Sequence, residues 1–496
     1  MQDKNHLIAS NINGKPNAGM SLQSFCVHAH FYQPPREDPI TGIIPMEPGA
    51  APFLNWNERI HSECYRPNAE LGNYEHISFN FGPTLYEWMQ AFDTLTCQRI
   101  IAQDRVNLDR YGVGNAIAQP YHHTILPLAT RRDKQTQVIW GIEQFAHRFG
   151  RRPLGMWLPE AAVDNETLGI LAEQGIEFTI LAPWQAESDH LDVTEPYRVP
   201  LPGGRSISAF FYHSGLSGSL SFNPAMTVDA DLFARNELVS QYRAEKNQRG
   251  EPQILLIATD GELYGHHQPL RNHFLAHLVD GAATNLGLSS TFPALWLKDH
   301  PPRRTIRIRE RTSWSCHHGV ERWRDSCACV PGNQEWKKQL RSAYDRLSKR
   351  LDRLYIRSVS PYISDPWALR DRYIRAILGI QSVEDMIAEM AGRRLSEDVS
   401  DRIQKLLRAQ YERQKMYASC AWFFEDFDRI EPRNSVAYAA QAVIWTSRAT
   451  GVDVALQFSA DLQRVVSQRT GWRGSRVLTD HLVRTNRENT TNLSFW

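Results

Sequence analysis

The feature that most constrains the fold is a short apolar run, residues 254–258, that is followed at once by acids. The run is rich in branched side chains and too short for an ordinary helix, so it is predicted to be a buried parallel strand. Asp260 and Glu262 come directly after it, with Gly261 between them. Barrel and open α/β enzymes carry their chemistry at the carboxyl ends of such strands. The alternative is a polar loop that caps the next helix, and Asp260 alone does not decide between the two.

A second stretch has the same form. Residues 154–160, LGMWLPE, are another apolar run that ends in a single acid, Glu160. A helical pattern follows, with Gly175 as its stop, and then a further strand is predicted over residues 177–181. The chain therefore offers two acids, Glu160 and Asp260, at the same end of two predicted strands. Carboxylates paired across a cleft in this way indicate chemistry on glycosidic bonds.

Strands recur between helical segments as far as residue 258, which favours a parallel α/β architecture, and a barrel before an open sheet. No glycine-rich nucleotide-binding loop opens any of these helices. The composition shifts after residue 302, and helical patterns with charged faces and apolar stripes follow, over residues 336–355, 367–392, 396–417, 434–449 and 452–467. The predicted organisation is a disordered leader, a catalytic barrel, a connecting region and a helical domain, over residues 1–22, 23–302, 303–335 and 336–496.

Charge and composition exclude several classes of partner. The formal net charge is +1, so nothing indicates nucleic acid or an anionic membrane as a partner. The seven cysteines form no regular framework and are odd in number, which favours a reducing compartment. The first twenty residues contain no apolar signal region, and no apolar run approaches membrane-spanning length. We therefore expect a cytoplasmic protein that does not bind membranes.

Two histidines mark the first predicted strand, residues 24–31. His28 and His30 alternate with apolar residues and so lie on one face of the strand. They are interior histidines held by hydrogen bonds, or they line a polar active-site floor, or they form a pair of metal ligands. The pattern leaves these three interpretations open.

A cluster of cysteines and histidines lies in the connecting region, at Cys316, His317, His318, Cys327 and Cys329. These residue types bind zinc, but their spacing matches none of the common patterns, which use paired CxxC-like ligands. An ordered loop that closes over the barrel mouth is the favoured interpretation. We therefore expect no metal here, and no cofactor in the protein as a whole.

Four segments resemble motifs of glycoside hydrolase family 57, whose members are retaining enzymes that act mainly on α-glucans. They are HAHFYQP (28–34), GNAIAQPYHHTILPL (114–128), MWLPE (156–160) and TDGELYG (259–265). The resemblance implies an incomplete parallel (β/α)7 barrel followed by an α-helical C-terminal domain. It also implies that Glu160 is the nucleophile and Asp260 the general acid/base of a double displacement without a cofactor. A longer first motif and the segment SWSCHHGVERW are similar to a bacterial subgroup of the family.

The same resemblance suggests which side chains contact the sugar. Those expected in the barrel are His28, His30, Gln33, His123, Trp157 and His266. In the family an aromatic-rich segment of the helical domain helps to complete the sugar cleft, which here suggests Trp422, Phe423 and Asp426. For these three, packing in the helical core is the alternative.

Two other classes of function remain as alternatives. One is a metal-dependent carbohydrate enzyme on a related barrel, such as a polysaccharide deacetylase or a zinc mannosidase, with His28 and His30 as ligands. The other is a non-catalytic glucan-binding homologue, against which the presence of both acids argues. Hydrolase and glucanotransferase both stay open, because the two share the glycosyl-enzyme intermediate and differ only in the acceptor that reaches it.

Overall fold

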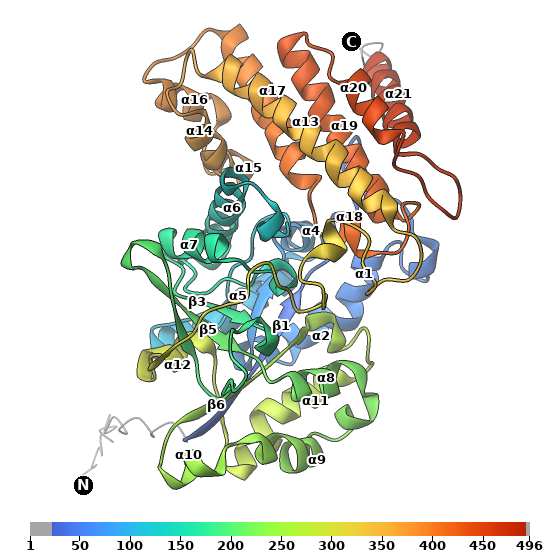
Figure 1. Ribbon diagram of the computed structural model, residues 1–496. Coiled ribbons are helices and arrows are strands. Elements are labelled where there is room, and N and C mark those ends of the chain that lie inside the picture. Colours follow the sequence, from blue (N-terminus) through green and yellow to red (C-terminus); the bar gives the residue numbers. More distant parts are fainter. Residues whose placement is uncertain (1–21, 493–496) are drawn as a thin grey trace, which may run out of the picture.

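The central strand of the fold is β1 (Gln23–Phe31), which pairs in parallel with β2 (Ser78–Phe81), β6 (Gln253–Asp260) and the short β7 (Ser289–Ser290) (Figure 1). The computed structural model describes residues 22–492, so all of the leader predicted at residues 1–22 except Leu22 lies outside the described residues. The register places His30 opposite both Asn80 and Asp260. The first histidine motif therefore lies beside the second predicted acid.

The sheet continues around a ring through two further strands and two segments that are too short to count as strands. β3 (Phe178–Leu181) pairs in parallel with β5 (Ser206–Phe211), and the backbone N–H of His213 donates to the carbonyl of Leu256 on β6 at 2.7 Å. Parallel bridges close the gap between β2 and β3, at Phe79–Ala116, Ala118–Met156 and Gly155–Phe178. Five strands and these two bridged segments form the incomplete seven-stranded barrel that the sequence predicted. Outside this ring, β4 (Tyr197–Pro200) runs antiparallel to β5 and pairs with β8 (Arg304–Thr305), a ribbon that was not predicted.

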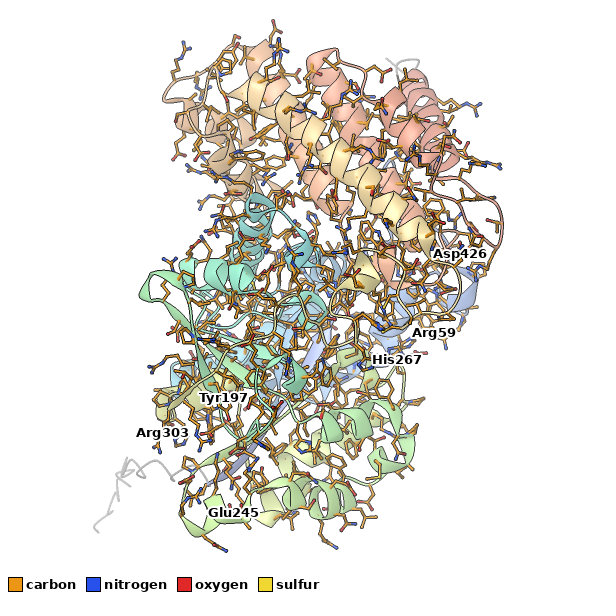
Figure 2. The ribbon with its side chains drawn as sticks, in the orientation of Figure 1. Arg59, Tyr197, Glu245, His267, Arg303 and Asp426 are labelled. Atoms are coloured by element: carbon orange, nitrogen blue, oxygen red, sulfur yellow. The ribbon has the colours of Figure 1, made fainter. Side chains whose placement is uncertain are left out.

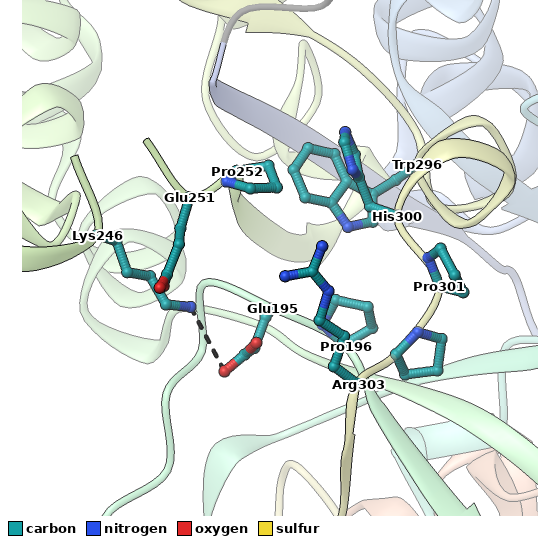
Figure 3. A pocket seen from close by; sticks show the side chains of 10 residues that line it. Glu195, Pro196, Lys246, Glu251, Pro252, Trp296, His300, Pro301 and Arg303 are labelled. Carbon is teal, nitrogen blue, oxygen red and sulfur yellow. Dashed lines mark ion pairs between the residues drawn. The ribbon is translucent and has the colours of Figure 1, made fainter. Parts of the chain in front are cut away.

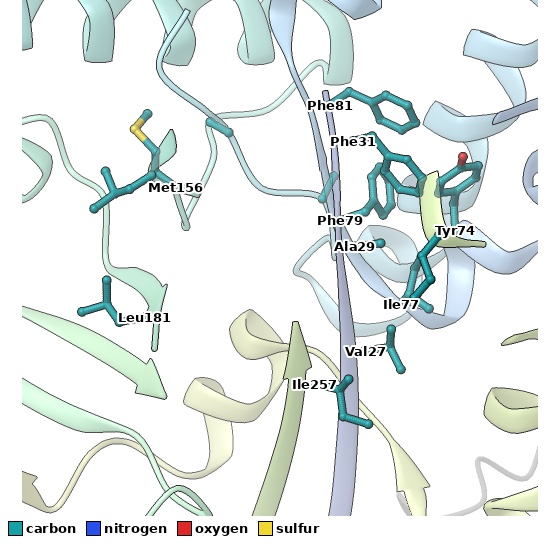
Figure 4. Close-up of a cluster of buried hydrophobic side chains, with 14 of the residues drawn as sticks. Val27, Ala29, Phe31, Tyr74, Ile77, Phe79, Phe81, Met156, Leu181 and Ile257 are labelled. Carbon is teal, nitrogen blue, oxygen red and sulfur yellow. The ribbon is translucent and has the colours of Figure 1, made fainter. Parts of the chain in front are cut away.

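The alternation of side chains on β1 separates two hydrophobic layers. Val27, Ala29 and Phe31 point outward into the larger cluster, where Figure 4 shows Phe31 among the rings of the neighbouring strand and helix. Cys26 belongs instead to the cluster inside the barrel, together with Trp157. Because successive residues of a strand face opposite sides, His28 and His30 share the inner side with Cys26. Buried apolar surface stabilises by roughly 25 cal/mol per Å². A slip of the β1 register by one residue would turn the apolar side chains away from the larger cluster and turn the histidines into it, so the register is strongly fixed.

Helices surround the ring on its outer side. They begin and end at local signals: Asp164 caps the helix after residue 160 by accepting from the Thr167 N–H at 2.8 Å, and Gly150 ends the preceding helix with a φ of 67°. The helices of this part are α1 (Trp56–Ile60), α2 (Arg66–Glu70), α3 (Asn73–His76), α4 (Pro83–Phe92), α5 (Thr94–Tyr111), α6 (Arg131–Phe149), α7 (Asn165–Glu173), α8 (Ser214–Phe222), α9 (Ala230–Leu232), α10 (Ala244–Gln248), α11 (Arg271–His277) and α12 (Pro293–Asp299).

The C-terminal part is helical and lies above the barrel in Figure 1. The predicted helix over residues 367–392 is divided in three. A first break falls at Tyr373, and a second follows Gly379, which turns the chain with a φ of 69° before Ser382 caps a new helix. A further helix, α21, follows the last predicted one. The helices are α13 (Glu335–Val359), α14 (Pro366–Arg372), α15 (Ile374–Ile377), α16 (Val383–Ala391), α17 (Glu397–Lys415), α18 (Cys420–Phe423), α19 (Ile430–Thr450), α20 (Ala455–Leu462) and α21 (Gly474–Asn492). Among residues 22–492 no helix combines the length and apolarity that crossing a membrane requires.

A buried ionic cluster joins the helical part to the barrel. Asp133 of α6 accepts hydrogen bonds from Arg413 at 2.7 Å and Gln414 at 2.6 Å, and it pairs with Arg370 at 3.1 Å. The two guanidinium groups hold the pKa of Asp133 well below its usual range despite its burial. A buried carboxylate shared by two arginines leaves uncompensated charge if one partner moves away, so this contact fixes the two parts together.

Candidate active site

A cavity of about 660 Å³ opens at the carboxyl ends of β3, β5 and β6. This is the end of the strands at which barrel enzymes place their chemistry. Figure 2 shows His267, one of the residues at the cavity, below Asp426 of the helical part. The walls are formed by Glu160, Trp184, Tyr212, Ser214, Ser217, Gly218, Ser221, Phe222, Ala258, Thr259, Asp260, Leu263, His267, Trp314, Ser315, Arg322 and Phe423. Both acids that the strand pattern singled out therefore lie in one cavity.

Glu160 sits on a strained turn. Its φ is 58° and that of Ala161 is 46°, in the left-handed region that residues with a side chain seldom adopt. Such strain persists only where the surroundings impose it, and it clusters at functional sites. Here the backbone carbonyl of Glu160 accepts from the Trp314 N–H at 3.0 Å. The turn brings the carboxyl group into the cavity instead of continuing the strand.

Two donors hold the carboxylate of Glu160. Its Oε2 accepts from Ser315 Oγ at 2.6 Å and from Trp314 Nε1 at 3.1 Å. Burial raises the pKa of Glu160 above its ordinary value, and these two hydrogen bonds oppose that rise because they favour the ionised form. The arrangement therefore orients a carboxylate that is otherwise poorly solvated.

Asp260 ends β6 with its surface open to the cavity. Desolvation by the surrounding protein, and then the negative charge of Glu160, raise the pKa of Asp260 to about 7. The two carboxyl groups are thus close enough to influence one another, and an ionised Glu160 favours the protonated form of Asp260. Pairs of acids whose environments separate their pKa values are typical of acid/base catalysis.

A chain of buried histidines runs beside the acids. His30 Nε2 lies 3.2 Å from His123 Nε2, and His123 Nδ1 lies 2.6 Å from Ser419 Oγ. Asn80 Nδ2 lies 3.0 Å from His30 Nδ1. Burial lowers the pKa of His30 to about 3 and that of His123 well below its usual value, so both are neutral at physiological pH.

An aromatic layer carries these histidines. His28 and His30 stack on Trp157 at ring-centroid distances of 4.9 and 5.1 Å, and the Trp157 ring meets that of Trp314 edge-on at 4.9 Å. His28 Nδ1 lies 2.9 Å from Ser78 Oγ. His28 and Trp157 are completely buried. Of the contacts expected from the first and third motifs, these two therefore support the cavity wall from behind instead of facing into the cavity.

Two further residues expected at the substrate, Gln33 and His266, are not among those that line the cavity. Gln33 Nε2 donates to Glu262 Oε1 at 3.5 Å. His266 pairs with Glu63 at 2.5 Å, while its neighbour His267 lines the cavity. His267 therefore lines the cavity and His266 does not, although their ring centroids lie only 4.9 Å apart, because the His266 ring is held by Glu63.

Of the three candidates in the helical part, only Phe423 lines the cavity, and Arg322 lies over its ring at 4.6 Å. Trp422 is completely buried in the helical core, where its Nε1 donates to the Lys337 carbonyl at 3.2 Å. Asp426 accepts from the backbone N–H of Phe427 at 2.5 Å and from that of Arg469 at 3.0 Å, so it holds the loop after α18. For Trp422 and Asp426 the structure favours the alternative of a packing role, because neighbouring residues of one turn point in different directions.

Glu262 was assigned no chemistry from the sequence, and in the structure it holds a neighbouring side chain and the turn after β1. Its Oε1 accepts from Tyr65 Oη at 2.7 Å and from the Tyr32 N–H at 3.1 Å. Burial, and then the nearby Asp260, raise the pKa of Glu262 to about 8. The ring of Tyr32 in turn stacks on that of His123, with 3.7 Å between the ring centroids. Glu262 thus couples the first and fourth motifs without entering the cavity.

A second hollow, shown in Figure 3, lies at the other end of the barrel. It has a volume of about 50 Å³ and contains the ion pair of Lys246 with Glu195 at 3.4 Å. Pro252, at its edge, immediately precedes β6, so this hollow is at the amino ends of the strands. Residues at that end of a barrel stabilise the fold, so this hollow is not the candidate active site.

A barrel with two interacting acids at the carboxyl ends of its strands is typical of α/β enzymes that act on glycosidic bonds. The profile of glycosyl hydrolase family 57 matches residues 51–309, more than half of the chain. The chain belongs to glycosyl hydrolase family 57. A second profile, of a domain of unknown function (DUF3536), matches residues 332–494.

Individual relatives are distant. An α-amylase of Pyrococcus abyssi is 23% identical over 219 residues, which cover 42% of this chain and 30% of that protein. The match thus spans less than a third of the length of this curated relative.

Solved structures share the fold over nearly the whole chain. An exo-type maltose-forming amylase from Pyrococcus sp. ST04 superposes with a TM-score of 0.72 at 16% identity, over 93% of this chain and 88% of that one. A GH57-type branching enzyme from Pyrococcus horikoshii gives 0.61 at 14% identity, over 94% and 95%. A 4-α-glucanotransferase from Thermococcus litoralis gives 0.54 at 16% identity, over 86% and 60%. These likenesses establish the incomplete barrel with its helical part.

Proposed function

We propose that this protein is a retaining glycoside hydrolase or glucanotransferase that acts on α-glucans by double displacement. The observation that carries the proposal is the pair Glu160 and Asp260, which line one cavity and interact through their charges. The membership in glycosyl hydrolase family 57 supports it, as do the activities of the relatives, an amylase, a branching enzyme and a glucanotransferase.

In this mechanism the carboxylate of Glu160 attacks the anomeric carbon. Ser315 and Trp314 donate to one of its oxygens and so leave the other free for the attack. Protonated Asp260 gives its proton to the leaving glycosidic oxygen, and a glycosyl-enzyme forms. Asp260, now ionised, takes a proton from water or from a sugar hydroxyl, which attacks the same carbon and releases Glu160.

The cavity walls fit a sugar chain. Trp184, Tyr212 and Phe423 present aromatic faces on which sugar rings pack. His267 and Arg322 supply polar groups to the hydroxyls. His30 and His123 are buried beside Asp260 and bonded to each other, to Asn80 and to Ser419, so we propose that they support this wall instead of contacting the sugar. Gln33 stays a proposed contact.

The metal-dependent alternative has less support. Among residues 22–492, only one group of three or more metal-ligating side chains comes together, and neither His28 nor His30 belongs to it. His30 is engaged through both ring nitrogens, by His123 and by Asn80. A catalytic zinc site needs three protein ligands around an open position.

The test is a product analysis on a panel of α-glucans. We expect the purified protein to shorten or rearrange α-1,4-linked maltooligosaccharides, and the first product formed to keep the α configuration. Adding glucose or maltose as an acceptor separates the two activities, because a transferase then elongates the acceptor while a hydrolase releases reducing ends. Chromatography of the products and proton NMR of their anomers are the measurements. Products of inverted configuration, or none from any α-glucan, would contradict the proposal.

The pH dependence of kcat/KM follows from the two carboxyl groups. Glu160 must be ionised to attack, so activity rises as the pH increases through its pKa, which burial places above the ordinary value. Asp260 must be protonated to donate, so activity falls as the pH increases through its pKa of about 7. We expect a bell-shaped profile whose basic limb lies near neutrality and whose two limbs belong to the coupled pair. Ser315→Ala removes a donor to the Glu160 carboxylate and should move the acid limb to higher pH. An unchanged acid limb in that variant would contradict the assignment of this limb to Glu160.

A further inference from the structure

The connecting region has a second face that the proposed mechanism does not use. On one side of this segment, Trp314 and Ser315 hold Glu160. On the other side, the side chains of Cys316, His318, Cys327 and Cys329 come together, and one potential ligand atom of each lies within 4.8 Å of all the others. His317 is not part of this group.

We propose that these four side chains bind a single structural zinc ion through three thiolates and one imidazole nitrogen. The distance between Cys316 Sγ and Cys327 Sγ is 3.4 Å, and that between Cys329 Sγ and Cys316 Sγ is 3.9 Å. His318 Nδ1 lies 3.3 Å from Cys327 Sγ and 3.4 Å from Cys329 Sγ. In a tetrahedral site with Zn–S near 2.3 Å and Zn–N near 2.0 Å, ligand atoms lie roughly 3.5–3.8 Å apart. The cluster therefore already has about the size of a zinc shell.

The donor set selects the type of metal. Thiolates and imidazole suit zinc, whereas magnesium and calcium require oxygen ligands. Four protein ligands without an open position are typical of a structural site. The expectation from spacing alone was that no metal binds here, because CxH and CxC are not the common pairs. The fold reverses that expectation because it brings the pair Cys316 and His318 next to the pair Cys327 and Cys329.

The charge of the surroundings fits a metal–thiolate centre. Zinc with three thiolates and a neutral histidine carries a net charge of −1. Lys337 of α13 is completely buried, its Nζ has no hydrogen-bond partner among the described residues, and it lies 5.8 Å from the Trp336 ring. Burial, and then the charge of Arg322, lower the pKa of Lys337 to about 8, and negative charge on Cys327 and Cys316 opposes this. A buried ammonium needs a compensating anion, and the zinc centre supplies one.

The backbone around the cluster is held as metal loops usually are. Gln334 Nε2 donates to the Cys327 carbonyl at 3.1 Å, and the Gly319 N–H donates to the Cys316 carbonyl at 3.1 Å. Arg322, which lines the cavity, reaches the Cys329 carbonyl at 3.4 Å. Outer contacts of this kind orient ligands and tune the metal.

The site has a consequence for Glu160. Cys316 directly follows Ser315, so an ion that fixes Cys316 also fixes the hydroxyl that donates to Glu160. Zinc is thus a positioning element for the carboxylate and takes no part in the reaction. This consequence rests on the proposed function, whereas the binding of the ion does not.

The first experiment measures metal content in the full-length protein, purified without chelators. We expect about one zinc per chain by elemental analysis, and loss of most of it in Cys329→Ser and His318→Ala. His317→Ala is the matched control, since it alters the adjacent exposed histidine, and it should retain the zinc. Zinc retained in both ligand variants, or wild-type protein that binds none after reduction and incubation with zinc, would overturn the site.

A measurement on the unaltered protein avoids variants that fail to fold. Replacing zinc by Co²⁺ should produce the thiolate-to-cobalt charge-transfer and d–d bands of a tetrahedral sulfur-rich site. Titration with a mercurial reagent should release the bound metal as the thiols react. A Cys316–Cys327 disulfide, found as two missing thiols in the denatured protein, would overturn the proposal instead.

The positioning role has its own readout. Removal of zinc should shift the acid limb of the pH profile to higher pH, in the same direction as Ser315→Ala, while Ser315→Ala itself keeps its zinc. A metal-free protein with an unchanged acid limb would overturn the positioning role and leave the site as a stabiliser of the loop. If no glucan is a substrate, the zinc content and the cobalt spectrum still decide the metal site, so the two proposals fail separately.

Discussion

Replacing Glu160 by alanine should reduce kcat/KM on natural α-glucans by about 10⁴-fold or more, because no covalent intermediate can then form. The space left by the lost carboxylate admits a small anion on the face that Glu160 occupied. With an α-glycosyl fluoride and added azide, we expect turnover to return and the product to be a glycosyl azide of inverted configuration. The measurements are steady-state rates and NMR of the azide product.

Glu187→Ala is the matched control for this variant, since Glu187 is an exposed acid outside the cavity lining. It should keep wild-type activity. A Glu160→Ala protein with undiminished activity would place the chemistry elsewhere. A rescued product of retained configuration would assign the nucleophile to another residue.

Replacing Asp260 by alanine should lower kcat/KM on natural glucans by about 10²- to 10⁴-fold, because an unprotonated alkoxide leaves poorly. A substrate with a dinitrophenolate leaving group needs no proton, so this variant should still form the glycosyl-enzyme. The intermediate then accumulates, since no base activates water. Azide needs no general base, so it should restore turnover and give a product of retained configuration.

The basic limb of the pH profile should vanish in the same variant, because Asp260 is the group whose ionisation near pH 7 ends the activity of the native protein. Asp189→Ala, which alters an exposed acid, is the control and should keep the limb. Equal losses of rate on natural and activated substrates would contradict the role of Asp260 as proton donor. An azide product of inverted configuration would show that Asp260 is the nucleophile and Glu160 the proton donor.

The sequence located the main elements of the barrel because their signals are local. The run at residues 254–258 became β6 and the run at residues 177–181 became β3, each within a few residues. A buried parallel strand has both faces covered, so an unbroken apolar run indicates it without knowledge of its neighbours. By contrast, residues 154–160 were predicted as a strand but form only isolated bridges, at Gly155 and Met156, and β4 was not predicted. Both outcomes depend on pairing partners.

The errors in the helical part have a related cause. α21 was not predicted, because its stripe of apolar residues is thin and its polar residues dominate the pattern. Residues 367–392 were predicted as one helix, since the apolar period continues across Gly379. Tertiary packing, not propensity, supplies most of a helix's stability in a protein, and packing decided both cases.

The sequence by itself determined that each of two acids follows a buried apolar run, and it indicated which motif each belongs to. Strand periodicity and the turn that follows a strand are properties of neighbouring residues. Only the tertiary structure decided what surrounds those acids. Ser315 and Trp314 reach Glu160 from about 150 residues further along the chain, and His318 meets Cys327 and Cys329 across a loop. Such contacts depend on the path of the chain between them, because hydrogen bonds and metal–ligand geometry are set by distance in space and not by spacing in sequence.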